Sequence, residues 1–314
     1  MTKLKIIYFG SPYYSVPVLE KIVNIGHEVP LVISQGSKKT RRGRVIHTPI
    51  YEFCDKNNLR CITPDKISPN ILDDIAMVEA DLGIVYSYGR LIPQGVIDST
   101  KFGIMNLHCS LLPAYRGAAP IQHALINNES KTGITYFEIN EKLDEGKMIL
   151  SKVYNISESD NCKTIQDNLT DIAVKCFPEA IDKMCNKEYT HSSSSKKSTY
   201  AKRIIKEDAY LNWDMNIRLI FNTVRALHIW PVARVNICGD EIKILDASCI
   251  EKKHELPTGT VMSFNKDELI IAAKEGFLSI LKLQLEGKKP ITNRDLYNSH
   301  YSIKETLINN CANI

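Results

Sequence analysis

Two side chains suited to acyl-transfer chemistry stand two positions apart near the middle of the chain. Asn106 and His108 lie in and beside an apolar run at residues 103–107 that reads as a buried strand. On an extended strand, residues two apart share a face, so the carboxamide and the imidazole point the same way. A carboxamide can donate a hydrogen bond to a developing oxyanion, and an imidazole can exchange protons near neutral pH. This pair therefore predicts acyl transfer.

An acidic residue completes the set. Asp144 stands in the turn Leu143-Asp144-Glu145-Gly146, which follows a strand expected over residues 133–138. If this strand is a parallel neighbour of the first, it can bring the turn back beside His108, where a carboxylate would orient and charge the imidazole. A single Asp before Gly is commonly a turn former, and a single His at a strand end is commonly structural. The combination therefore carries the hypothesis.

The elements that must position these side chains alternate in type. Short β-rich runs alternate with helical runs in the first half of the chain, which is typical of a parallel sheet with helices on both faces. Ser15 is placed to cap the first helix, and Pro17 suits its first turn. Ligands bind at the carboxyl ends of strands in such sheets. We therefore expect a doubly wound α/β fold, with strands at 5–9, 29–34, 81–86 and 103–107 and helices at 16–24, 49–57 and 69–78.

A second domain is expected after a polar stretch. Residues 188–201 are rich in Ser, Thr and Lys and lack periodicity, so they favour a linker. Short strand-like runs with intervening turns follow a helical run and indicate a small OB-like β-barrel. The expected domains are residues 1–188 and 205–314, with a linker at 189–204. The second is expected to contain a helix at 215–227 and strands at 233–237, 241–250, 259–263, 269–273 and 277–284.

Composition limits the class of protein. The 44% hydrophobic content of the 314 residues can supply two cores, and no run approaches the ~18 apolar residues needed to cross a bilayer. The nine cysteines include no C-x-x-C pair and no zinc-site spacing, so we expect reduced thiols and no metal. Cys109 is expected to be a packing residue. The sequence thus predicts a cytoplasmic protein without a membrane partner.

The positive charge is unevenly distributed along the chain. Residues 196–314 hold 18 Lys and Arg against 14 Asp and Glu, while residues 1–195 are balanced at 22 against 22. This basic bias fits contact with a phosphate backbone but equally fits a solvated surface.

The turn at residues 9–12 lacks G-x-G-x-x-G, and Pro12 removes a backbone N–H that a phosphate would need, so dinucleotide binding is not favoured.

A known family carries the same motifs along nearly the whole chain. The core reads Asn106-Leu-His108-Cys-Ser110-Leu-Leu-Pro113, followed by Tyr115-Arg-Gly-Ala-Ala-Pro-Ile121 and Leu143-Asp144-x-Gly146. Other matches are Phe9-Gly-Ser-Pro12, Tyr86-x-Tyr-Gly-x-Leu-Ile-Pro93, Trp230-Pro231 and Leu283-Gln-x-x-Gly-Lys-Lys289. The sequence resembles the methionyl-tRNA formyltransferases.

The resemblance implies a function and roles for particular residues. It implies transfer of a formyl group from 10-formyltetrahydrofolate, a reduced folate, to the methionine α-amino group of initiator methionyl-tRNA. Asn106, His108 and Asp144 would be catalytic, and Ser110, Leu111, Leu112 and Pro113 would contact the folate. We expect a monomer, because the partner would be a large nucleic acid. The resemblance implies that the formyltransferase domain comes first, and it assigns tRNA binding to a basic loop. The loop has five cations in seven positions, which could neutralise phosphates: Lys38, Lys39, Arg41, Arg42 and Arg44.

Two departures and two alternatives remain. Tyr13-Tyr14 stand where the family usually has an Asp, and Gly36-Ser37 stand where its basic loop has Pro-Asp, so the loop geometry can differ. One alternative is formylation of a small amine, such as an amino sugar nucleotide or glycinamide ribonucleotide, with the same core. The second domain and the Trp230-Pro231 feature argue against it. The other alternative is a non-catalytic RNA-binding protein that uses the β-domain.

Overall fold

The computed structural model describes residues 3–39, 43, 45–190 and 197–311. It divides into two compact units, each built from separate stretches of chain. The first contains residues 1–120, 131–155 and 166–201, and the second contains residues 121–130, 156–165 and 202–314.

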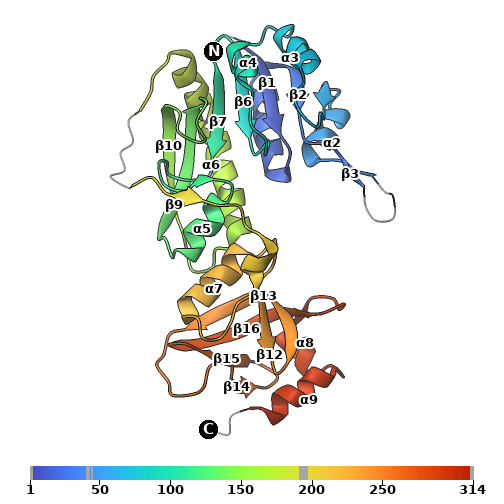
Figure 1. Cartoon of the computed structure of the whole chain (residues 1–314), viewed down its shortest axis with the longest axis vertical. Helices are drawn as coiled ribbons and strands as arrows, with labels where there is room; N and C mark the ends of the chain where they lie inside the picture. Colours follow the sequence, from blue (N-terminus) through green and yellow to red (C-terminus); the bar gives the residue numbers. More distant parts are fainter. Residues whose placement is uncertain (1–2, 40–42, 44, 191–196, 312–314) are drawn as a thin grey trace. The chain divides into compact units, whose positions relative to one another are not determined.

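The first unit is built on one seven-stranded sheet (Figure 1). Its strand order is β10 (Met148–Asn155), β9 (Lys131–Glu138), β7 (Ile104–His108), β6 (Leu82–Tyr86), β1 (Lys5–Gly10), β2 (Glu28–Ile33) and β5 (Cys61–Ile62). The pairs from β7 to β5 are parallel, whereas β9 and β10 are antiparallel. The doubly wound α/β class is confirmed. The parallel neighbour expected for the strand before Asp144 is wrong, because β9 runs antiparallel to β7.

Helices cover both faces of this sheet, which explains why its central strands are apolar throughout. Successive residues of β1 face opposite sides, and Ile6 to Phe9 are all fully buried. Ile7 and Phe9 belong to an apolar cluster that also contains residues of α3 and α4. On the other side, the hydroxyl group of Tyr8 contacts Ser15, directly before α1. The helices are α1 (Val16–Asn24), α2 (Pro49–Lys56), α3 (Pro69–Ala76), α4 (Gln94–Asp98) and the later part of α6 (Cys162–Cys185).

The predicted elements of this unit are confirmed to within two residues, but one cap is wrong. Ser15 makes no side-chain capping bond to α1. Its hydroxyl instead donates at 2.8 Å to the carbonyl oxygen of Tyr86 on β6, the strand next to β1. Thr48 does cap α2, accepting from the Tyr51 amide at 3.2 Å. A buried polar partner thus took precedence over local capping at Ser15.

Short elements complete the first unit. The 3-10 helix η1 (Tyr13–Ser15) precedes α1. Two parallel two-residue strands, β8 (Arg116–Gly117) and β11 (Tyr200–Ala201), pair with each other. The basic loop begins and ends in a small antiparallel pair, β3 (Lys38–Lys39) and β4 (Val45–Ile46), and Arg41, Arg42 and Arg44 lie outside the described residues.

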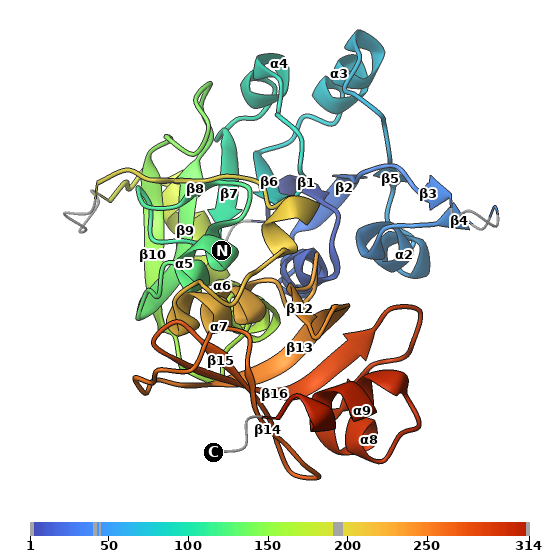
Figure 2. The same cartoon turned by 60° about the horizontal axis from the view of Figure 1, so that its bottom comes forward.

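The second unit is an antiparallel sheet bent around its own core (Figure 2). The strand order is β12 (Arg234–Ile237), β13 (Asp240–Ile250), β16 (Gly276–Leu285), β15 (Leu269–Ala273) and β14 (Val261–Phe264), with β17 (Ile291–Thr292) paired to β16. The register of the β13–β16 pair shifts at Ile244 to Ala247, and such irregularities bend a sheet. The expected β-domain is confirmed, although no pairing joins β12 to β14 in the described chain.

Helices accompany this sheet. The 3-10 helix η2 (Lys206–Ala209) and α7 (Ile217–Ala226) precede β12, and α8 (Asn293–Tyr297) and α9 (Ser302–Asn309) follow β17. Buried Ile220 and Val224 of α7 belong to the same core cluster as Ile244 of β13, and so does Leu307 of α9. The second unit also contains most of α5 (Pro120–Ile126) and the first residues of α6.

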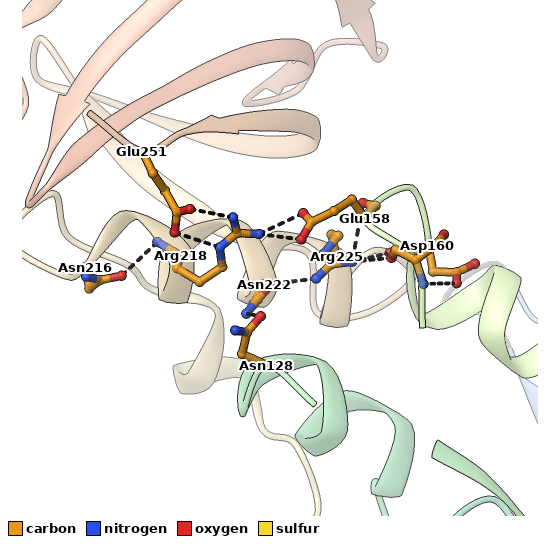
Figure 3. Close-up of polar contacts among 9 residues, drawn as sticks. Asn128, Glu158, Asp160, Asn216, Arg218, Asn222, Arg225 and Glu251 are labelled. Atoms are coloured by element: carbon orange, nitrogen blue, oxygen red, sulfur yellow. Dashed lines mark hydrogen bonds and ion pairs between the residues drawn. The ribbon is translucent and has the colours of Figure 1, made fainter. Parts of the chain in front are cut away.

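Polar contacts hold the two earlier stretches of chain in the second unit (Figure 3). Arg225 donates from one guanidinium nitrogen to the carbonyl oxygens of Ser157, Glu158 and Asp160 at 2.9, 3.3 and 3.2 Å. The side chain of Asn222 bonds to that of Asn128 at 3.0 Å and to Arg225 at 2.6 Å. These contacts explain why residues 121–130 and 156–165 cluster with α7.

Candidate active site

The structure brings together the three side chains that the sequence singled out. Asn106 and His108 lie on β7, which places both on one face at the carboxyl end of the strand. Asp144 lies in the loop between β9 and β10, with Oδ2 at 3.8 Å from Nδ1 of His108. Both of these side chains are more than nine-tenths buried. The trio therefore forms a compact polar group in the first unit.

The loop that carries Asp144 needs a particular backbone. Asp144 itself has a φ of 52°, a left-handed conformation that Asp tolerates better than most residues. Two positions later, a Cβ on Gly146 would overlap the carbonyl oxygen of Glu138, so only glycine fits. Because β9 is antiparallel to β7, it ends beside the start of β7. The loop after β9 must therefore run back toward the carboxyl end of β7 for Asp144 to reach His108, and this turn sequence allows it.

Backbone groups of the segment after His108 hold the trio in place. The His108 Nε2 lies 2.8 Å from the carbonyl oxygen of Tyr115, and the Gly117 amide donates to Asp144 Oδ2 at 2.7 Å. Arg116, between those two residues, donates to Glu145 at 2.7 Å. Nε2 of His108 is therefore within hydrogen-bond distance of a backbone oxygen, while Nδ1 faces the Asp144 carboxylate.

Asn106 differs from its two neighbours because its carboxamide is open. The side chain is partly buried and makes no hydrogen bond to any residue in the described parts of the chain. A carboxamide carries two N–H donors and an acceptor oxygen. This group can therefore bind a ligand without first breaking a protein contact.

The predicted folate segment is held from within. The Ser110 hydroxyl is buried and donates to the carbonyl oxygen of Ala114 at 2.7 Å, while Thr135 donates to the Ser110 carbonyl at 2.7 Å. Leu112 is buried, whereas Leu111 and Pro113 keep part of their surface exposed. The peptide bond from Leu112 to Pro113 is cis. Of these four side chains, the two partly exposed ones are placed to meet a ligand.

Sequence reasoning missed the partners of the trio. The Tyr115 carbonyl contacts His108 and the Gly117 amide contacts Asp144, and both are backbone groups without a side-chain signature. Thr135, which holds Ser110 in the following segment, was also missed. The run Tyr115-Arg116-Gly117 was noticed only as a motif. Backbone partners of this kind become visible only when the chain is folded.

Three further observations concern metal binding, the cysteines and membrane-spanning helices. Among the described residues, no group of three or more His, Cys, Asp and Glu side chains could hold a metal ion. All nine cysteines are free, and burial raises the pKa of the Cys109 thiol, as expected for a packing residue. No helix in the described ranges combines the length and apolar character that a membrane span requires.

Comparison with known families shows what the chain is similar to. The chain matches the formyl transferase family over residues 3–181 and the formyl transferase C-terminal domain over residues 203–301. It is 36% identical over 292 residues to the methionyl-tRNA formyltransferase of Thermodesulfovibrio yellowstonii, covering 92% of this chain and 94% of that protein. The corresponding enzyme of Fusobacterium nucleatum is 36% identical over 303 residues, covering 95% and 97%.

A solved structure shows a similar fold. The N-formyltransferase of Helicobacter canadensis, in complex with folinic acid and dTDP-3-aminofucose, has a TM-score of 0.67 at 20% identity, covering 88% of this chain and 98% of that one. This likeness concerns the fold alone. Since the family model spans more than half of the chain and the relatives match it nearly end to end, the chain belongs to the methionyl-tRNA formyltransferase family.

Proposed function

We propose that this chain transfers the formyl group of 10-formyltetrahydrofolate to the α-amino group of methionine on initiator methionyl-tRNA. The observation that carries the proposal is the open carboxamide of Asn106 beside His108, whose ring nitrogens both face oxygen atoms. The amine must add to the formyl carbon, and negative charge then develops on the formyl oxygen. An N–H donor already aimed at that charge lowers the barrier.

Each member of the trio has one proposed role. Asn106 donates a hydrogen bond to the oxyanion, and His108 in its protonated form adds positive charge beside it. Asp144 faces Nδ1 of His108 and helps to remove a proton from the attacking amine through water. An α-amine has a reference pKa of about 7.7, so a usable fraction is neutral at the start. The new C–N bond forms, and tetrahydrofolate leaves once its nitrogen is protonated.

The remaining assignments follow from the family. We propose that Leu111 and Pro113 contact the folate with their exposed surface, and that Ser110 and Leu112 shape the segment from inside. The basic loop with Lys38, Lys39, Arg41, Arg42 and Arg44 would bind tRNA phosphates. We retain residues 1–188 as the catalytic domain, 189–204 as a linker and 205–314 as the tRNA-binding domain. We propose a cytoplasmic monomer, because the partner is a large nucleic acid used in translation.

A formyl-transfer assay tests the proposal. It compares methionine-charged initiator tRNA, methionine-charged elongator tRNA and uncharged tRNA as acceptors for 10-formyltetrahydrofolate, with His108→Ala as the control variant. Formylation of the charged initiator alone, lost in the variant, is the expected result. If folate still binds but no tRNA accepts the formyl group, the acceptor is a small amine such as an amino sugar nucleotide. Binding of tRNA regardless of its aminoacyl group, without transfer, would indicate an RNA-binding protein.

A further inference from the structure

The side of β7 that faces away from His108 carries a second polar group. Val85 of β6 pairs with Asn106, so the next residue, Tyr86, faces the side opposite to Asn106 and His108. Cys109 directly follows His108, the last residue of β7. Its thiol lies 3.5 Å from the Tyr86 hydroxyl and 3.6 Å from Nε2 of Gln166. Thr170 lies 3.0 Å from the same tyrosine hydroxyl. We call these four residues, Tyr86, Cys109, Gln166 and Thr170, the Tyr86 cluster.

Local structure places these four side chains together. Tyr86 is the last residue of β6, the parallel neighbour of β7. Gln166 and Thr170 are four residues apart on α6, so they share one face of the helix. Tyr136 of β9 also reaches α6, where its hydroxyl donates to the Ala173 carbonyl oxygen at 3.0 Å. This face of α6 therefore lies against the sheet.

In the Tyr86 cluster, each hydroxyl proton can be assigned to a hydrogen bond. Thr170 donates to the backbone oxygen of Gln166 at 2.9 Å, so its own oxygen can accept from Tyr86. Gln166 Nε2 donates to the Tyr86 oxygen at 2.7 Å and has a second N–H for the thiol of Cys109. Tyr86 is 1% exposed, Thr170 3% and Cys109 7%. Gln166 is partly buried. A network with three buried members restricts the side chains that form it.

We infer that Tyr86 and Gln166 are positioning residues for His108, acting through Cys109. The inference rests on the proposed function of His108. Thr135 holds the next residue, Ser110, by its carbonyl oxygen from the neighbouring strand β9. The chain leaving His108 is therefore held at two successive residues, by the Tyr86 cluster and by Thr135. Small misplacements of a reacting group slow an enzyme severely, so loss of the Tyr86 contact has a kinetic cost.

The test compares two tyrosines that each bond to α6. Tyr86→Phe removes the hydroxyl that contacts Cys109. The control Tyr136→Phe removes the hydroxyl of an equally buried residue, and among the described residues that hydroxyl bonds only to the Ala173 carbonyl. We expect the two variants to lose similar thermal stability. Only Tyr86→Phe should lower kcat, on the order of tenfold, with both KM values changed by less than about twofold. Equal kcat values for the two variants would overturn the inference.

A double-mutant cycle distinguishes positioning from a general packing effect. Cys109→Ala removes the thiol that transmits the effect, so Tyr86→Phe should lower kcat in the parent protein and leave it unchanged in the Cys109→Ala background. Gln166→Leu should behave as Tyr86→Phe does. Additive losses would contradict transmission through Cys109. If His108→Ala retains full activity, the proposed function fails; if it is inactive while Tyr86→Phe is fully active, only the positioning role fails.

Discussion

His108 and Arg225 are two basic side chains that the fold buries almost equally, and they are used differently. They are 7% and 9% exposed, and a ring nitrogen of His108 and the Arg225 guanidinium each lie against backbone carbonyl oxygens. His108 also faces the carboxylate of Asp144, and its neighbour on the strand, Asn106, has an open carboxamide. That combination leaves the histidine next to a place where a ligand can bind.

Arg225 is closed in by the protein. Its two terminal nitrogens donate to the carbonyl oxygens of residues 157, 158 and 160 and to the side-chain oxygen of Asn222, whereas its buried Nε has no partner among the described residues. No carboxylate lies within ion-pair distance in the described parts of the chain. Burial lowers the pKa of Arg225, the direction expected when a cation loses water. A buried cation that contacts backbone and amide oxygens and the Phe221 ring is structural, whereas a buried histidine beside a carboxylate and a free donor is suited to chemistry.

The largest expected effect concerns activity at the first of these sites. Replacing Asn106, His108 or Asp144 by Ala should reduce turnover by about a hundredfold or more, because each contributes to charge stabilisation or proton transfer. Circular dichroism and a thermal melt should show a folded protein. A variant with near-normal turnover would remove that residue from the mechanism.

The next effect concerns stability at the second site. Arg225→Met removes the guanidinium donors from the carbonyl oxygen of Asp160 and the side-chain oxygen of Asn222, two buried residues. It should lower the free energy of unfolding by about 2–4 kcal/mol, measured by urea denaturation. Arg218→Met is the matched control, since Arg218 joins the more exposed Glu158 and Glu251 and should cost about 1 kcal/mol or less. Equal losses in the two variants would refute the distinction between them.

A third prediction concerns Arg42 of the basic loop, which is expected to bind a tRNA phosphate and to contribute neither to catalysis nor to folding. Arg42→Ala should weaken tRNA binding and reduce the slope of log Kd against log salt by about one, because one phosphate contact is lost. Folate affinity and the melting temperature should stay at their parent values. Lys175→Ala, which removes an exposed cation of α6, is the control. An unchanged salt slope for Arg42→Ala would make the basic loop an ordinary solvated surface.

The smallest effect is a pH dependence in the second unit. Hydrogen bonding to Arg218 lowers the pKa of Glu251 below its ordinary value of 4.5. Because the pKa of Glu251 is lower in the folded state than in the unfolded state, the stabilisation from its contact with Arg218 is fully present above pH 4.5. This stabilisation is lost as the pH falls through the folded-state pKa. Glu251→Gln should therefore cost well under about 1 kcal/mol near neutral pH, and the difference should vanish near about pH 3. A difference that persists in acid would exclude this cause.

The sequence predicted most of the fold because local patterns specify most of its elements. The helix at residues 16–24 is observed with those bounds, and the strands of both units were placed to within two residues. The trio was found because Asn106 and His108 share a strand face and Asp144 stands in a glycine turn. The long helix α6 and strand β10 had not been predicted.

Tertiary structure alone decided how these pieces are held. Ser15 looked like a helix cap but donates to Tyr86, and β9 runs antiparallel although a parallel strand was expected. The basic excess in the last third of the sequence suggested a surface for phosphates, yet Arg225 is buried against carbonyl oxygens. Residue type and spacing determine which chemistry a chain can attempt. Which groups are satisfied by the protein and which stay open depends on contacts between distant residues, and those exist only once the chain has folded.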